Sequence, residues 1–299
     1  MTLPELRLRS ARAKSDLEAM MGRLPGEHDV TFKLEGPCRV VKPDTSPLCV
    51  YLPGALRNEM AGAYDVLHML KDERTDNRGD ASGTARAKRG DQKRTRSSLI
   101  SSAVIGAVDP GGIYHFCRLT SWTGTHLPEW QSLQPLLQAI DNNLGHHVPN
   151  RWERQRQAIL GVPSEWVVPG TIFTTVTVNN TYSTGVHADS GDYGPGFSTL
   201  AVSRRGDFEG GWFVFPKWRI GIDMQDGDLL LLDAHELHGN TVLRRPDGQP
   251  ATAAELRSGE FERISVIAYL RSGMTKCGTW PEEEAKGRAY ADTRMGVTS

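Results

Sequence analysis

The spacing of apolar residues changes near Gly161. Before this glycine, apolar side chains recur every three or four positions, which is the spacing of amphipathic helices. The pattern predicts supporting helices over residues 4–21, 55–71, 129–144 and 150–161.

After Gly161, β-branched and aromatic runs alternate with clusters of Gly, Pro, Asn and Asp. Such short runs predict strands joined by turns, with a tight hairpin turn at Asp226-Gly227. The expected strands cover residues 171–178, 198–203, 211–215, 219–223, 228–233 and 264–270. We therefore expect an α+β protein with a double-stranded β-helix (jelly roll) core and N-terminal supporting helices.

The length of 299 residues is compatible with one large catalytic domain over residues 1–299. Within it we expect mainly helical support over 1–165 and the jelly-roll core over 166–275. A basic, flexible segment is expected over 72–96.

The formal net charge of -1 gives no general sign of nucleic-acid binding, but basic residues cluster in TARAKRGDQKRTR, residues 84–96. Two interpretations stay open for this run: a solvated loop, or an arm that contacts DNA phosphates. Its cations are Arg86, Lys88, Arg89, Lys93, Arg94 and Arg96.

No apolar stretch has the length of a membrane span or the form of a secretion signal, so we expect a cytoplasmic protein without a membrane partner. If the basic run binds DNA, a nuclear or nucleoid location is the alternative. The cysteines form no CxxC pair, and free thiols are expected. They are Cys38, Cys49, Cys117 and Cys277.

The triplet HAD suggests a metal site. His187 and Asp189 are two positions apart, so on an extended segment both side chains point the same way. Two imidazoles and a carboxylate on one face of an iron ion leave three positions open for other ligands. His235 and His238, at the end of the run DLLLLD, can each supply the second imidazole.

The run ERISVIAYLR places polar groups on one face of a strand. Arg263, Ser265, Ile267, Tyr269 and Arg271 share that face by their period of two. A guanidinium matches a carboxylate with two parallel hydrogen bonds, so Arg263 is the expected anchor for 2-oxoglutarate, with Ser265 adding a hydroxyl donor.

Three stretches make the chain resemble the TET/JBP family of Fe(II)- and 2-oxoglutarate-dependent dioxygenases, which oxidise the 5-methyl group of pyrimidines in DNA. They are TVTVNNTYSTGVHADSGD, FEGGWFVFP, and ELHGNTV followed by ERISVIAYL. The resemblance implies Fe(II), 2-oxoglutarate and O2, and it favours His238 over His235. The residues it implies are His187, Asp189 and His238 for iron, and Arg263 and Ser265 for 2-oxoglutarate.

Asn180 and Tyr182 resemble positions that line the co-substrate pocket, with a capping Asn and a core Tyr as the alternatives. A base that leaves the DNA stack needs an aromatic platform, and Tyr269 is the candidate for it. Arg271 is the candidate for a further contact with that base. The chain departs from the family at Arg271, where some relatives have a base-contacting histidine, and in an insertion over residues 244–262. We expect a monomer.

Asp192 bears on which base is oxidised. A carboxylate accepts a hydrogen bond from the N4 amino group of 5-methylcytosine, whereas thymine presents an oxygen there. We therefore favour 5-methylcytosine, converted to 5-hydroxymethylcytosine, over thymine, converted to 5-hydroxymethyluracil. An Asp that only caps the SGDYGPG turn, a hydroxylase of proteins or small molecules, and a DNA-binding protein without turnover stay as alternatives.

Overall fold

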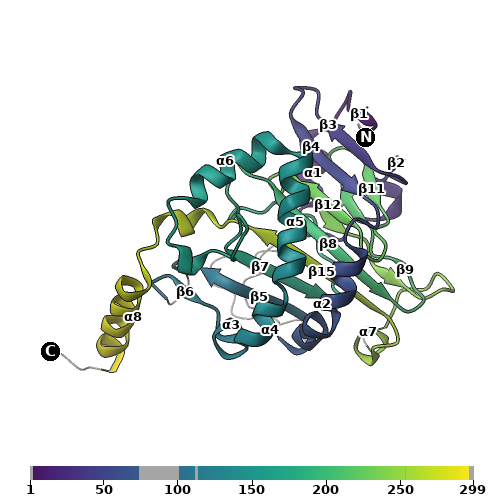
Figure 1. Ribbon diagram of the computed structural model, residues 1–299. Coiled ribbons are helices and arrows are strands. Elements are labelled where there is room, and N and C mark those ends of the chain that lie inside the picture. The colour runs from purple at the N-terminus through teal and green to yellow at the C-terminus, as the bar shows by residue number, and fades with distance from the viewer. Residues whose placement is uncertain (1–2, 74–100, 112–113, 253, 296–299) are drawn as a thin grey trace. The chain divides into compact units, whose positions relative to one another are not determined.

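Buried apolar runs build a large sheet of nine strands in the computed structural model, which describes residues 3–73, 101–111, 114–252 and 254–295 (Figure 1). In order across the sheet they are β1 (Glu5–Arg7), β3 (Cys38–Val41), β4 (Pro47–Leu52), β12 (Leu229–Leu232), β8 (Ser198–Arg205), β15 (Glu262–Tyr269), β7 (Thr175–Asn180), β5 (Ser101–Val108) and β6 (Arg118–Leu119). All four leucines of β12 are buried, as expected for a central strand.

Two smaller sheets accompany the large one. One has the order β13 (Gly239–Asn240), β10 (Phe213–Phe215), β11 (Ile220–Ile222) and β2 (Phe32–Lys33). The other pairs β14 (Leu243–Arg244) with β9 (Glu209–Gly210).

The helices are short. They are α1 (Lys14–Met20), α2 (Arg57–Met69), α3 (Ser121–Thr125), α4 (Leu127–Ser132), α5 (Gln134–His147), α6 (Pro149–Ile159), α7 (Glu255–Ser258) and α8 (Trp280–Met295). Single 3-10 turns are η1 (Glu27–Asp29), η2 (Leu70–Asp72), η4 (Ser164–Trp166) and η5 (Ser272–Lys276). None of the helices in the described residues is long and apolar enough to cross a bilayer.

The chain divides into two compact units, and several strands contribute residues to both. Unit 1 comprises Met1–Ala103, Val178–Ser190 and Leu200–Val266. Unit 2 comprises Val104–Thr177, Gly191–Thr199 and Ile267–Ser299. A single catalytic domain over the whole chain stays a prediction.

The six predicted strands are confirmed to within a few residues as β7, β8, β10, β11, β12 and β15. The expected hairpin at Asp226-Gly227 is wrong, because β11 and β12 belong to different sheets. Asp226 instead accepts hydrogen bonds from the Ser203 hydroxyl and the Arg204 amide, and the turn carries the chain between sheets.

The first 165 residues are less helical than expected, since they supply six strands. The expected helix over 4–21 is strand β1, which pairs with β3, followed by the short α1. The expected helix over 129–144 is two helices, because Pro135, in the first turn of α5, cannot continue α4. At residues 5–7, pairing with the distant strand β3 outweighs the local helical spacing.

The expectation of four free thiols is wrong for one pair. Cys117 and Cys277, 160 positions apart, form a disulfide within unit 2. Cys38 and Cys49 are free, as expected.

Candidate active site

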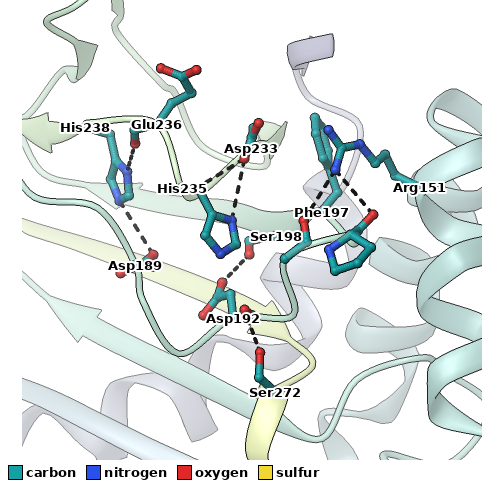
Figure 2. A network of polar contacts seen from close by, with 12 residues as sticks. Arg151, Asp189, Asp192, Phe197, Ser198, Asp233, His235, Glu236, His238 and Ser272 are labelled. Atoms are coloured by element: carbon teal, nitrogen blue, oxygen red, sulfur yellow. Dashed lines mark hydrogen bonds and ion pairs between the residues drawn. The ribbon is translucent and has the colours of Figure 1, made fainter. Parts of the chain in front are cut away.

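Three side chains of unit 1 converge as a metal-binding cluster. The ligand atoms of His187, Asp189 and His238 all lie within 4.8 Å of one another. One oxygen of Asp189 lies 3.5 Å from His187 Nε2. The other lies 3.6 Å from His238 Nε2 (Figure 2). One divalent ion can therefore bind all three, with the other half of an octahedron left for small ligands.

Backbone carbonyls orient both imidazoles. His187 Nδ1 lies 2.7 Å from the Gly185 carbonyl and His238 Nδ1 lies 2.9 Å from the Glu236 carbonyl. A carbonyl only accepts, so each Nδ1 carries the hydrogen and each Nε2 keeps its lone pair for a metal. Burial and the neighbouring His187 lower the pKa of His238 to about 4, which keeps that ring neutral.

Backbone pairing brings these distant segments together. His187 and His238 form an antiparallel bridge, in which each amide donates to the other carbonyl at 2.9 and 2.8 Å. The Asp189 amide donates to the Ala234 carbonyl at 2.9 Å. Phe213 stacks on the His238 ring with centroids 5.4 Å apart. The cluster is therefore fixed by hydrogen bonds and packing of the protein itself.

Of the two histidines that could supply the second imidazole, only His238 belongs to the cluster. His235 instead lies with its Nδ1 3.6 Å from Asp233 and is 41% exposed (Figure 2). The backbone turns between the two residues, so their side chains serve different neighbours.

Arg263 is a buried cation in the same unit. Its guanidinium donates to the Ser265 hydroxyl at 2.5 Å, while its Nε and Nη2 are buried and have no hydrogen-bond partner in the described part of the chain. Burial and the like charge of Arg204 lower the pKa of Arg263 to about 10. A buried charge that lacks acceptors is costly, and the carboxylate of 2-oxoglutarate fits this requirement. The Ser265 hydroxyl keeps its own hydrogen to donate.

Two residues to which the sequence assigned no role shape the surroundings of Arg263. Thr181 adopts a left-handed φ of 50°, and its amide and hydroxyl bind the backbone oxygen and nitrogen of Arg263 at 2.7 and 3.3 Å. Gly211, also left-handed at φ 68°, lies beside the arginine, where an added Cβ would be 3.0 Å from Arg263 Cδ. The double glycine was visible in the sequence, but only the structure reveals that Gly211 leaves room for the arginine.

Asn180 and Tyr182, expected in the co-substrate pocket, are both buried. The Asn180 amide donates to Glu262, and its oxygen accepts from the Thr181 hydroxyl at 2.7 Å. Asn180 thereby links the end of β7 to the Glu262 side chain of β15, and its contact with 2-oxoglutarate stays a prediction.

The three expected substrate residues belong to unit 2. Asp192 is buried; its carboxylate accepts from the Ser198 hydroxyl and its backbone oxygen accepts from the Ser272 hydroxyl at 2.9 Å (Figure 2). Tyr269 and Arg271 hydrogen-bond to each other, as residues on one face can.

Further neighbours hold Tyr269 and Arg271. Tyr269 lies 3.2 Å from the Thr177 hydroxyl, and Arg271 forms an ion pair with Asp109 at 2.5 Å. Their roles toward a base stay predictions. The basic run Arg86, Lys88, Arg89, Lys93, Arg94 and Arg96 lies outside the described residues.

Comparison with known proteins agrees with this site. The Tet_JBP family model, the oxygenase domain of the 2OGFeDO superfamily, matches residues 112–272. The bifunctional helicase and thymine dioxygenase JBP2 of Leishmania infantum is 32% identical over 160 residues, which are 54% of this chain and 13% of that protein. Thymine dioxygenase JBP1 of Trypanosoma brucei brucei is 30% identical over 191 residues, 60% of this chain and 21% of that protein. The chain thus spans about a fifth or less of these relatives.

The solved structure of NgTET1 in complex with 5mC DNA has a similar fold. Its TM-score is 0.57 at 13% sequence identity, and the match covers 86% of each chain. At this identity the likeness concerns the fold alone, and it confirms the predicted α+β class with a jelly-roll core.

The His187→Ala variant should lose iron, because only two of the three ligands would remain. We expect its iron affinity to fall more than about 100-fold, since changes to groups behind the ligands alone cost about 10- to 100-fold. Metal content after gel filtration measures this. His235→Ala is the control and should retain iron; equal losses in both variants would remove His187 from the site.

Gly211→Ala should weaken 2-oxoglutarate binding about tenfold or more, because the new methyl group presses on the Arg263 side chain. The measurement is the KM for 2-oxoglutarate, followed by succinate formation. Gly248→Ala is the matched control: its φ is equally left-handed at 78°, but nothing lies within 4 Å. If both variants raise KM alike, backbone strain and not the contact with Arg263 is responsible.

Proposed function

Since this chain belongs to the Tet_JBP family, the oxygenase domain of the 2OGFeDO superfamily, we propose that it hydroxylates the 5-methyl group of a pyrimidine base in DNA. The chain is an Fe(II)- and 2-oxoglutarate-dependent dioxygenase that uses O2. The observation that carries the proposal is the His187, Asp189 and His238 cluster in one unit with the uncompensated Arg263. The names of the relatives, which act on thymine or are bound to 5mC DNA, support DNA as the substrate.

The site residues of unit 1 have two separate tasks in this reaction. His187, Asp189 and His238 would hold Fe(II), and Arg263 with Ser265 would bind the distal carboxylate of 2-oxoglutarate. The bound metal and co-substrate supply the oxidation of an unactivated methyl group, with conversion of 2-oxoglutarate to succinate and carbon dioxide. The carbonyls of Gly185 and Glu236 keep both ligand nitrogens available, so the protein needs no proton transfer to bind the metal.

A methyl group within duplex DNA can be reached only if its base leaves the stack, and the lost stacking must be replaced by the protein. We assign this platform to Tyr269, whose hydroxyl is held by Thr177 and whose ring is therefore fixed. Arg271 is held by Asp109 and by Tyr269, and we assign it a polar contact to the same nucleotide. Asn180 and Tyr182 are assigned to the co-substrate pocket.

5-Methylcytosine is our first candidate for the base, with 5-hydroxymethylcytosine as product. Asp192 follows the ligand Asp189 by three residues, and its carboxylate can accept from the N4 amino group. Ser198 donates to one of its oxygens and thereby orients the carboxylate.

Thymine is the second candidate, and one observation favours it. The relatives with about 30% identity are thymine dioxygenases, whereas the structure that holds 5mC DNA is only 13% identical. The contact with Ser198 is also what a turn-capping Asp would make, and such an Asp would leave the base undetermined.

The function is tested by incubating the iron-loaded protein with 2-oxoglutarate and matched duplexes, followed by mass spectrometry of the nucleosides. One duplex contains 5-methylcytosine and the other only unmodified bases, including thymine. We expect 5-hydroxymethylcytosine from the first. Succinate without any modified nucleoside would instead indicate a hydroxylase of proteins or small molecules.

Asp192→Ala should reduce oxidation of 5-methylcytosine about tenfold to a hundredfold more than oxidation of thymine, because an unmatched acceptor in a closed pocket costs about 1 to 3 kcal/mol. Asp192→Asn should shift preference toward thymine, since its amide can donate to the O4 oxygen. Both are measured as product nucleosides.

Ser198→Ala separates base reading from turn capping. It removes the hydrogen bond within the turn and keeps the carboxylate. If each variant, Ser198→Ala and Asp192→Ala, loses as much activity on 5-methylcytosine as on thymine, Asp192 caps the turn and does not select the base.

A further inference from the structure

A groove in unit 1 is lined by basic side chains and has no role in the site described above. One wall is the segment from Leu6 to Arg12, which contains most of β1, and the other is the turn between β10 and β11, from Lys217 to Ile220. The Arg12 amide donates to the Lys217 carbonyl at 2.8 Å and joins the walls. The groove has a volume of about 460 Å³. We call it the N-terminal groove.

The charges that line this groove are of one sign. Among the described residues, its lining contains Arg7, Arg9, Arg12, Lys217 and Arg219 and no carboxylate. Acidic groups behind the lining neutralise three of the five. Glu5 pairs with Arg7, Asp29 with Arg12 and Glu236 with Lys217, at distances of 2.8, 3.1 and 2.9 Å.

Arg9 and Arg219 remain exposed, and neither has an ion-pair partner in the part of the chain that the structure describes. Two uncompensated cations therefore face solvent from opposite walls. A surface of this kind attracts anions.

Arg219 occupies a backbone conformation that arginine rarely adopts. Its φ is 54°, in the left-handed region, where a turn normally uses Gly or Asn. The turn itself gains nothing from the side chain, because its hydrogen bonds are made by the Arg219 backbone, whose oxygen accepts from the amides of Thr31 and Phe32. Strained residues of this kind concentrate at functional sites.

Both walls of the groove connect to the iron ligands within unit 1. Lys217 and Trp218 donate to the Glu236 carboxylate, and the Glu236 carbonyl orients His238. The other wall continues through α1 to Gly22 and Arg23, which exchange backbone hydrogen bonds of 2.8 Å with Val186, next to His187. Hydrogen bonds thus link both walls of the groove to the segments that carry the metal ligands.

We propose that the N-terminal groove binds the phosphodiester backbone of the DNA duplex that carries the target base. This inference rests on the proposed function for its ligand. The cations come from one continuous segment, residues 7–12, and from the opposite wall of the groove, an arrangement that suits a linear polyanion. Exposed Phe32, also in the lining, offers an apolar contact for the sugars.

The test is a double variant, Arg9→Gln with Arg219→Gly, measured for affinity to a methylated duplex over a range of salt concentrations. Each lost phosphate contact should reduce the slope of log affinity against log salt by about one, so the slope should fall by about two, and affinity at low salt should fall about tenfold or more. The thermal midpoint should stay equal or rise, because glycine adopts the left-handed φ without strain.

The control is Arg245→Gln with Arg288→Gln, which removes the same formal charge from two positions outside the groove. Its salt slope should equal that of the wild type. If the groove variant and the control change the slope alike, only net charge matters and the groove is not a DNA site. An unchanged slope in the groove variant, with intact iron content, also overturns the proposal.

The outcome is separable from that of the proposed function. If the wild type oxidises DNA and the groove variant keeps its slope, only the groove fails. If the slope falls by about two while no nucleoside is ever modified, the groove stands and the assigned reaction fails. If the wild type does not bind DNA at all, both fail.

Discussion

A cation buried without a carboxylate beside it costs free energy until an anion arrives. Arg263 is in this state: two of its nitrogens have no partner in the described part of the chain. Much of the surrounding structure maintains that condition. Thr181 has a left-handed backbone conformation and hydrogen-bonds to the Arg263 backbone. Gly211 has no side chain and so leaves room for the arginine, and the Asn180 amide joins two neighbouring strands by its hydrogen bond to Glu262. The fold stores binding energy for a dicarboxylate by leaving one of its own charges unsatisfied.

The metal cluster, in contrast, depends on hydrogen bonds of the backbone. Its ligands come from two segments that are 49 positions apart by the numbers of Asp189 and His238, and hydrogen bonds of the backbone hold them together. Carbonyl groups, whose identity no side-chain substitution can change, choose the tautomer of each imidazole. The chemistry of the side chains is therefore set by backbone geometry, and the few residues of the HAD and ELH motifs suffice to specify it.

The sequence predicted these parts unevenly. The period of two fixed the direction of His187, Asp189, Arg263 and Ser265, and six strands were found because their apolar runs are short and well bounded. The early strands were missed, because β1 pairs with β3 across the chain and a local helical spacing cannot report such pairing. The disulfide joins cysteines 160 positions apart, beyond any spacing rule. The left-handed backbone conformations of Gly211 and Arg219 could not be predicted, because residue type alone does not determine a φ angle.

The bridge between His187 and His238 has a consequence for metal identity. Backbone hydrogen bonds position the ligands, and they do not depend on the radius of the bound ion. For sites of nitrogen and oxygen ligands, Co²⁺, Ni²⁺ and Cu²⁺ bind more tightly than Fe²⁺. A site with these ligands cannot select the weaker binder by affinity. The protein must then rely on the relative abundance of free metals in its surroundings, and exposure to nickel or cobalt would silence it by exchange without disturbing its fold.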